Sequence, residues 1–130
     1  MLLLGRVLAG SAAEGAELTG DYQKLQGRWV VLRNEIKKQT TPELHGRVWI
    51  FEGKKFRLDT DKGSEAFVLE ETTQPKSIDF KDGRTADILG IYKFEGEKLV
   101  VCTAAAGKKR PKAFKTSMWT GTVLTELKRP

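Results

Sequence analysis

Leu25-Gln26-Gly27-Arg28-Trp29-Val30-Val31-Leu32 is the stretch around which we expect the rest of this chain to be organised. A Gly-x-Trp sequence opens a run of β-branched and large apolar residues, which is typical of a strand that begins at a crowded position. Alternation along this strand, expected over 27–34, puts Trp29, Val31 and Arg33 on one face. Gly27 allows a close approach that a Cβ would prevent, so we expect Trp29 to be a buried core residue.

The rest of the chain consists of short apolar runs separated by turn signals. Asp21 is expected to cap a helical turn over 22–26, and Thr41-Pro42 predicts a second short helical turn. Gly90 lies inside one run and indicates a bend or a bulge. Together with the first strand, this rhythm predicts an all-β antiparallel barrel or sandwich of eight or nine short strands. The further strands are expected at 47–52, 55–60, 65–71, 77–81, 86–95, 98–103, 112–116 and 122–129.

The length of 130 residues predicts one domain, expected over 21–130 behind a leader or flexible segment over 1–20. The leader is apolar but is interrupted by Arg6. It is either a degraded signal peptide, in which case the protein is periplasmic or secreted, or a loosely docked segment of a cytoplasmic protein. No stretch approaches the roughly 20 apolar residues that span a bilayer. The single cysteine, Cys102, excludes an internal disulfide and does not indicate a compartment.

The chemistry-bearing residues are sparse. One histidine and one cysteine, His45 and Cys102, cannot form a structural zinc site. Neither a nucleophile motif nor a phosphate-binding glycine loop is present in the sequence. The net charge is +6, yet charges of both signs alternate along most of the chain, unlike the basic stripe of a nucleic-acid binder. We therefore expect no catalytic residue, no metal, no cofactor and no specific nucleic acid.

One dense run of cations breaks this alternation. Lys108, Lys109, Arg110 and Lys112 follow one another closely, and Trp119 lies a few residues further on. The run is either a solvated flexible loop or a docking surface for an acidic protein or another polyanion. An aromatic ring beside cations is common in binding surfaces, so we take Lys108, Lys109, Arg110 and Trp119 as candidate contacts.

Three stretches together carry a resemblance to a known family: Leu25–Trp29; Leu89–Gly96 with Lys98–Cys102; and Arg110-Pro111-x-x-Phe114 with 121–124 and 127–129. In this order and spacing they resemble a lipocalin-like domain family of uncharacterised function that is abundant in planctomycete bacteria. The resemblance implies a calycin-type, up-and-down barrel that is closed at one end. It also implies that Trp29 forms the floor and that Arg129 of the last strand lies across it, and Gly27 is counted with them as a residue that closes the barrel.

Two functions compete on this basis. The first is a non-enzymatic module that binds a small apolar or amphipathic ligand in or at the mouth of the barrel, with Arg33 and Tyr92 as further candidate contacts. Arg33 either faces inward toward an anionic group or lies past the rim with its charge in water. The second is a protein-interaction or cell-envelope domain whose barrel is filled by side chains and whose basic loop and Trp119 contact an acidic partner. Five inward rings favour a filled barrel: Trp29, Phe56, Phe67, Tyr92 and Phe94.

Overall fold

A computed structural model describes residues 18–83 and 85–130. The first 17 residues of the expected leader over 1–20 lie outside the described part of the chain. Within the described ranges, none of the helices combines the length and the apolar character needed to cross a bilayer.

The secondary structure is almost entirely β. A short helix, α1 (Gly20–Leu25), precedes the first strand, and a 3-10 helix (Pro42–Leu44) follows the second. The strands are β1 (Gly27–Ile36), β2 (Gln39–Thr40), β3 (Val48–Glu52), β4 (Lys55–Leu58), β5 (Glu65–Glu70), β6 (Lys76–Lys81), β7 (Ile88–Glu95), β8 (Lys98–Thr103) and β9 (Val123–Lys128).

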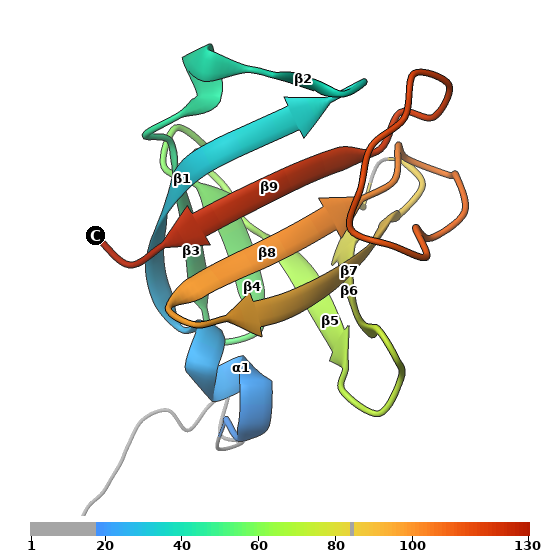
Figure 1. Ribbon diagram of the computed structural model, residues 1–130. Helices are drawn as coiled ribbons and strands as arrows, with labels where there is room; N and C mark the ends of the chain where they lie inside the picture. The colour runs from blue at the N-terminus through green and yellow to red at the C-terminus, as the bar shows by residue number, and fades with distance from the viewer. Residues whose placement is uncertain (1–17, 84) are drawn as a thin grey trace, which may run out of the picture.

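Eight of the strands close into an antiparallel barrel, as expected from the sequence (Figure 1). Neighbours in the sheet follow chain order from β3 to β9, and β1 pairs with both β3 and β9. Because every one of these strands has a partner on each side, the barrel has no exposed edge between its first and last strands. The short β2 is an additional strand that pairs only with the end of β1.

The two ends of the barrel differ. Figure 1 shows α1 beneath one end and the long 104–122 connection at the other. The turns after β3, β5 and β7 lie at the α1 end, where most of the large buried rings gather. We call this the closed end, and we call the opposite end, where β1, β4, β6 and β8 finish, the open end.

The inward faces of the strands form the core, as their alternation predicts. Trp29, Phe56, Phe67 and Tyr92 are buried, and Phe94 is half-buried against them. Phe51 adds a further ring, with its centroid 5.0 Å from that of Phe67 in an edge-to-face arrangement. Rings at this separation pack favourably, so the closed half of the barrel is filled.

Several local expectations are wrong. Residues 112–116 are not a strand, because β8 and β9 already pair directly and leave no free edge for them. Gly90 pairs regularly with Ile78 and Thr103, without a bulge. A Cβ at that position would lie 2.9 Å from the carbonyl oxygen of Cys102, so Gly90 serves close strand packing. Asp21 is not the N-cap of α1, a position that Thr19 occupies.

The bulge lies instead in β1. Val31 is opposite Leu127, but Arg33 is opposite Glu126, so Leu32 is an extra residue on this strand. The bulge moves Asn34, rather than Arg33, to the inward face. Arg33 therefore does not share a face with Trp29 and Val31, and its charge lies in water, which is the second of the two positions considered for it. Its guanidinium lies outside the barrel, 2.9 Å from Glu35 Oε1 and 3.7 Å from Glu126 Oε2.

Candidate functional site

The open half of the barrel holds two adjoining hollows. The larger has a volume of about 670 Å³ and reaches the turns that follow β4 and β6. The smaller has a volume of about 230 Å³ and lies against β1 and β9. Trp49, Leu58 and Thr103 line both. Volumes of several hundred Å³ are typical of sites that hold small organic molecules.

The walls of the larger hollow are mainly apolar. Trp49, Phe56, Leu58, Phe80 and Ile88 line it and come from β3, β4, β6 and β7. The ring of Trp49 meets that of Phe80 edge to face at 6.2 Å. These aromatic pairs give the walls a fixed shape, which favours binding of a flat or extended apolar body.

The smaller hollow contains an unpartnered polar group. Asn34 is 5% exposed, and its amide nitrogen donates a hydrogen bond of 2.9 Å to Thr125 Oγ1. The amide oxygen is buried and has no hydrogen-bond partner. A buried acceptor of this kind costs free energy unless a ligand or water satisfies it. If the amide is turned over, the unpartnered atom becomes a donor at the same place.

A second unsatisfied group borders the same hollow. Arg47 Nε is buried without a hydrogen bond and lies 3.7 Å from Asp59 Oδ1, while Arg47 Nη2 donates to Thr60 Oγ1 at 2.9 Å. Among the residues that the structure describes, Asn34 Oδ1 and Arg47 Nε are the two buried side-chain polar atoms without a hydrogen bond. Both residues line the 230 Å³ hollow, so this is where the barrel can accept the polar part of a ligand.

The rim of the larger hollow is charged. Asp61, Lys62, Glu65 and Asp82 line it. Burial raises the pKa of Glu65, and the carboxylates of Asp82 and Asp61 raise it further. An anionic rim of this kind disfavours entry of a strongly acidic molecule through the larger opening.

The closed end is built around Trp29. Its indole nitrogen donates a 2.9 Å hydrogen bond to the carbonyl oxygen of Leu25 at the end of α1. The guanidinium of Arg129 lies over the indole, 4.0 Å from the ring centroid, where the family resemblance places it. The same guanidinium donates to the carbonyl oxygens of Lys24 and Gln26 at 2.6 and 2.7 Å. Arg129 thereby ties the end of the chain to α1.

Gly27 makes this contact possible for two reasons. Its φ of +105° lies in a region that residues with a Cβ rarely adopt. A Cβ there would also lie 3.1 Å from Arg129 Nη1. The glycine of the Gly-x-Trp motif is therefore explained by the arginine that crosses the floor.

Tyr92 belongs to the closed end and lines neither of the two open-end hollows. Its hydroxyl donates a 2.6 Å hydrogen bond to Asp21 Oδ2, which also accepts from Lys76 Nζ at 2.9 Å. Burial by itself raises the pKa of Asp21, but the hydrogen bonds from Tyr92 and Lys76 outweigh it and lower the pKa. Burial and the Asp21 carboxylate raise the pKa of Tyr92. Tyr92 therefore contributes to the structure of the closed end, and its role as a ligand contact stays a prediction.

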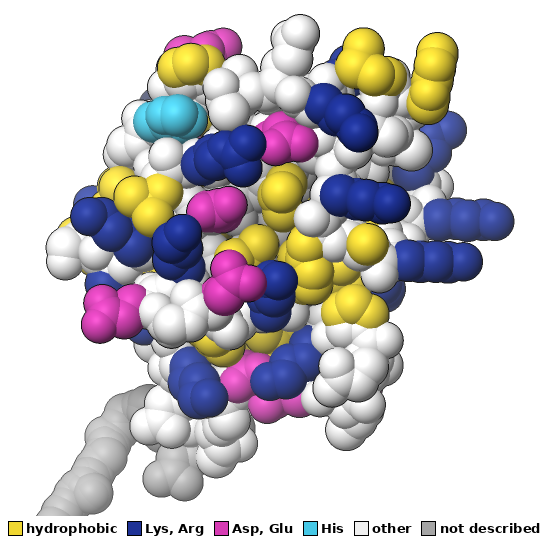
Figure 2. Space-filling model, in the orientation of Figure 1, with side chains coloured by type: hydrophobic (Ala, Val, Ile, Leu, Met, Phe, Trp, Pro, Cys, Tyr) yellow, Lys and Arg dark blue, Asp and Glu magenta, His cyan; other side chains and the backbone are white. Residues whose placement is uncertain are grey.

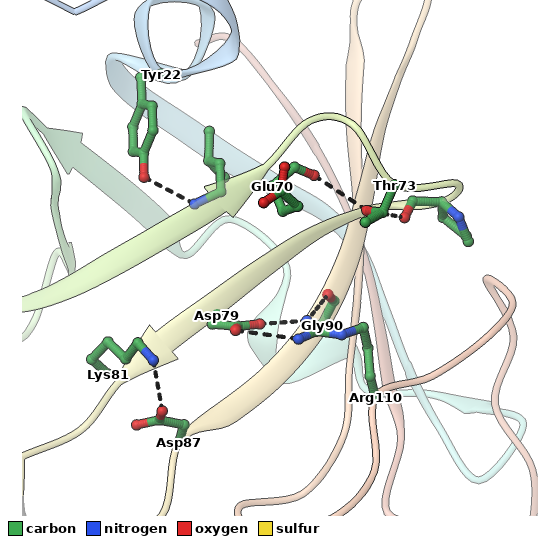
Figure 3. A network of polar contacts seen from close by, with 10 residues as sticks. Tyr22, Glu70, Thr73, Asp79, Lys81, Asp87, Gly90 and Arg110 are labelled. Atoms are coloured by element: carbon green, nitrogen blue, oxygen red, sulfur yellow. Dashed lines mark hydrogen bonds and ion pairs between the residues drawn. The ribbon is translucent and has the colours of Figure 1, made fainter.

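The basic run lies in the 104–122 connection at the open end. Arg110 lies against the outer wall of the barrel: its guanidinium forms a two-pronged ion pair with the carboxylate of Asp79 and donates to the carbonyl oxygen of Gly90 at 2.9 Å (Figure 3). It therefore anchors the connection to β6 and β7 instead of facing a partner. Lys108 and Lys109 are exposed, and Trp119 is 93% exposed.

The structure therefore divides the predicted site residues among three places. Gly27, Trp29, Arg129 and Tyr92 lie at the closed end; Arg33 lies on the outside of β1; Lys108, Lys109, Arg110 and Trp119 line one hollow of the 104–122 connection. Sequence reasoning missed Asn34 and Arg47. No local signal marks Asn34, because it lies between the charged residues Arg33 and Glu35 and its face depends on the bulge.

No protein-family model, curated protein or solved structure matches this chain. The resemblance to the planctomycete lipocalin-like family therefore stays a prediction. In the described ranges, no group of three or more His, Cys, Asp or Glu side chains is arranged to hold a metal ion.

Proposed function

We propose that the protein is a non-enzymatic, lipocalin-like binding module that holds a small amphipathic molecule in the open half of its barrel. The observation that carries the proposal is the unpartnered amide oxygen of Asn34 beside an apolar hollow. The ligand would place an apolar body against Trp49, Leu58 and Phe80 and a hydrogen-bond donor on Asn34 Oδ1. A ligand that donates a hydrogen bond to this oxygen removes the free-energy cost of burying an unpaired acceptor.

The alternative, a barrel filled by side chains, is favoured at the closed end but not at the open end. The large rings crowd around Trp29 and Phe51, whereas Thr103, Thr125 and Asn34 are too small to fill the space opposite Trp49. The basic residues of the 104–122 connection lie outside the barrel wall, so their interactions do not depend on whether the barrel is filled.

A neutral fluorescent probe tests the proposal. N-phenyl-1-naphthylamine carries an apolar body and a single N–H donor, and the basic loop does not attract it electrostatically. We expect saturable binding by the full chain, with Kd on the order of 1–100 µM for a ligand of this size. Ile88→Trp adds an indole to the wall of the larger hollow and should weaken binding at least tenfold. Val68→Trp adds the same group on the exposed outer face of β5 and is the matched control.

The polar contact has its own test. Asn34→Leu keeps the volume of the side chain but removes the amide, so it should weaken binding of the probe by about threefold to tenfold. A probe without an N–H group, 1-phenylnaphthalene, should not lose affinity. Absence of saturable binding, or equal effects of Ile88→Trp and Val68→Trp in variants with unchanged thermal midpoints, would overturn the proposal.

A further inference from the structure

The 104–122 connection concentrates positive charge at one side of the barrel. It contains five basic residues, at 108, 109, 110, 112 and 115, and no Asp or Glu. Arg110 is neutralised by Asp79, which leaves four lysines facing solvent. Figure 2 shows Lys and Arg side chains projecting on the side where Figure 1 draws this connection, with hydrophobic side chains at the upper edge of the same side.

The connection is held in place at several points. Besides the ion pair of Arg110, Thr116 Oγ1 donates to Glu35 Oε2 at 2.5 Å and accepts from the backbone N–H of Lys38 at 2.9 Å. The Cys102 thiol approaches the carbonyl oxygen of Lys115 at 3.6 Å. The lysines therefore project from an anchored support, which reduces the entropy lost when they meet a surface of opposite charge.

An apolar tip stands beside these cations. Ser117 Oγ accepts hydrogen bonds of 3.2 Å from the backbone N–H groups of Trp119 and Thr120, which closes a tight turn. Met118 and Trp119 project from this turn and are 53% and 93% exposed. They are the two most exposed large hydrophobic side chains of the described residues, and they are adjacent in sequence. An indole with its N–H end in polar surroundings suits the headgroup region of a bilayer.

The cations and the tip belong to one surface. Lys108, Lys109, Lys112, Lys115 and Trp119 line the same hollow of about 680 Å³. Clustered lysines next to a membrane-facing apolar group are the usual combination for binding anionic lipid, because the apolar group enters the interface while the ammonium groups meet phosphates and carboxylates.

We propose that this surface docks the protein on a membrane of anionic lipids. Met118 and Trp119 enter the headgroup region, and Lys108, Lys109, Lys112 and Lys115 contact the lipid phosphates. A bilayer fits better than an acidic protein, because a projecting indole needs no preformed cavity in a soft interface. The docking rests on the loop alone and is independent of ligand binding in the barrel. It would nevertheless bring the open end close to the lipid.

Sedimentation of the full chain with large vesicles tests this proposal. We compare phosphatidylcholine alone with phosphatidylcholine containing 30% phosphatidylserine, in 50 and 500 mM NaCl. We expect at least tenfold stronger binding to the anionic vesicles at low salt and loss of most of that difference at high salt, since screening weakens contacts between exposed charges. Binding that does not depend on phosphatidylserine would overturn the proposal.

Two pairs of variants locate the surface. Lys108→Ala with Lys109→Ala should weaken binding to anionic vesicles by about tenfold. Lys55→Ala with Lys128→Ala removes the same charge from exposed positions at the closed end and should have less than a twofold effect. Equal losses in the two double variants would mean that net charge alone drives the binding, and the proposal would fail.

The tip is tested by fluorescence. Trp29 is buried and Trp49 is half-buried, so a change in the emission of Trp119 is measured as the difference between the wild-type protein and Trp119→Phe. We expect a blue shift on anionic vesicles and quenching by brominated lipid. Salt-sensitive binding without this shift, together with equally strong binding to poly-glutamate, would assign the surface to acidic polymers and overturn membrane docking.

Discussion

The closed and open ends of the barrel are made from the same eight strands. They differ in whether their buried polar atoms have hydrogen-bond partners and whether their aromatic rings are closely packed. At the closed end, Trp29, Tyr92 and Arg129 all find partners, and the rings pack against one another. At the open end, Asn34 Oδ1 and Arg47 Nε have no hydrogen bond, and the rings border empty volume. The difference indicates that stabilising contacts are concentrated at one end, and that unsatisfied polar atoms and empty volume are concentrated at the other.

The largest change in the free energy of unfolding is expected for a substitution at the floor of the barrel. Trp29→Ala should lower the free energy of unfolding by about 3–5 kcal/mol, because a large buried side chain leaves a cavity. Denaturant unfolding at pH 7 measures the change. Trp119→Ala is the matched control and should change the free energy by less than about 0.5 kcal/mol, since the side chain is exposed. Similar losses in both variants would contradict the assignment of stability to the closed end.

The buried carboxylate of Asp21 should have the next largest effect. Asp21→Asn should cost about 2–4 kcal/mol at pH 7, because the contacts of the carboxylate with Tyr92 and Lys76 are lost. The pKa of Asp21 is lowered in the folded protein, so its stabilisation is present above the ordinary value of 3.8 and is lost as pH falls through the folded-state pKa.

Unfolding curves of wild type and Asp21→Asn from pH 7 to pH 3 check this dependence. The difference between the two proteins should be constant near neutrality and should shrink at the acid end. A difference that grows as the pH falls would mean that the carboxylate is held in its protonated form, in conflict with its contacts.

The contact between Arg129 of the last strand and Trp29 of the floor should contribute less to the free energy of unfolding. A double-mutant cycle with Trp29→Phe and Arg129→Ala should give a coupling energy of about 0.5–2 kcal/mol, as expected for a guanidinium over an aromatic ring. Pairing Arg129→Ala with Trp119→Phe gives the reference cycle and should show no coupling. A value of zero in the first cycle would leave the carbonyl hydrogen bonds of Arg129 as its only contribution.

The smallest effect is expected at the open rim. Because the pKa of Glu65 is raised in the folded protein, wild-type stability decreases as pH rises from the ordinary value of 4.5 through the folded-state pKa. Glu65→Gln removes this loss. It should therefore stabilise the protein at pH 7 by about 0.3 kcal/mol, a small value because the group is largely solvated, and should have no such benefit at pH 3. Thermal midpoints of the wild-type protein and of Glu65→Gln at the two pH values measure this difference. A lower midpoint for the variant at pH 7 would mean that Glu65 stabilises the protein and would contradict the prediction.

Local sequence patterns predicted the floor of the closed end. Gly27 and Trp29 could be assigned to it because strand alternation is local, and because a glycine before a large ring indicates a close approach. The position of Arg129 was implied by the family resemblance. The antiparallel up-and-down order also follows from short strands joined by tight turns, since such turns bring consecutive strands together. The side chains of the filled half were accordingly identified with few errors.

The open end depends on contacts between residues that are far apart in the sequence. The bulge at Leu32 arises where β1 pairs with β9, and Asn34 and its partner Thr125 are 91 positions apart in the sequence. The charge of Arg110 is likewise paired with Asp79, 31 positions away in the sequence, so it is not available to a partner as the other cations of the basic run are. Alternation is set by neighbouring residues, whereas register and ion pairing depend on the strand that arrives from elsewhere. A one-residue shift exchanges the two faces of a strand, so the inward side chain at the candidate site is fixed by long-range pairing and not by the local pattern.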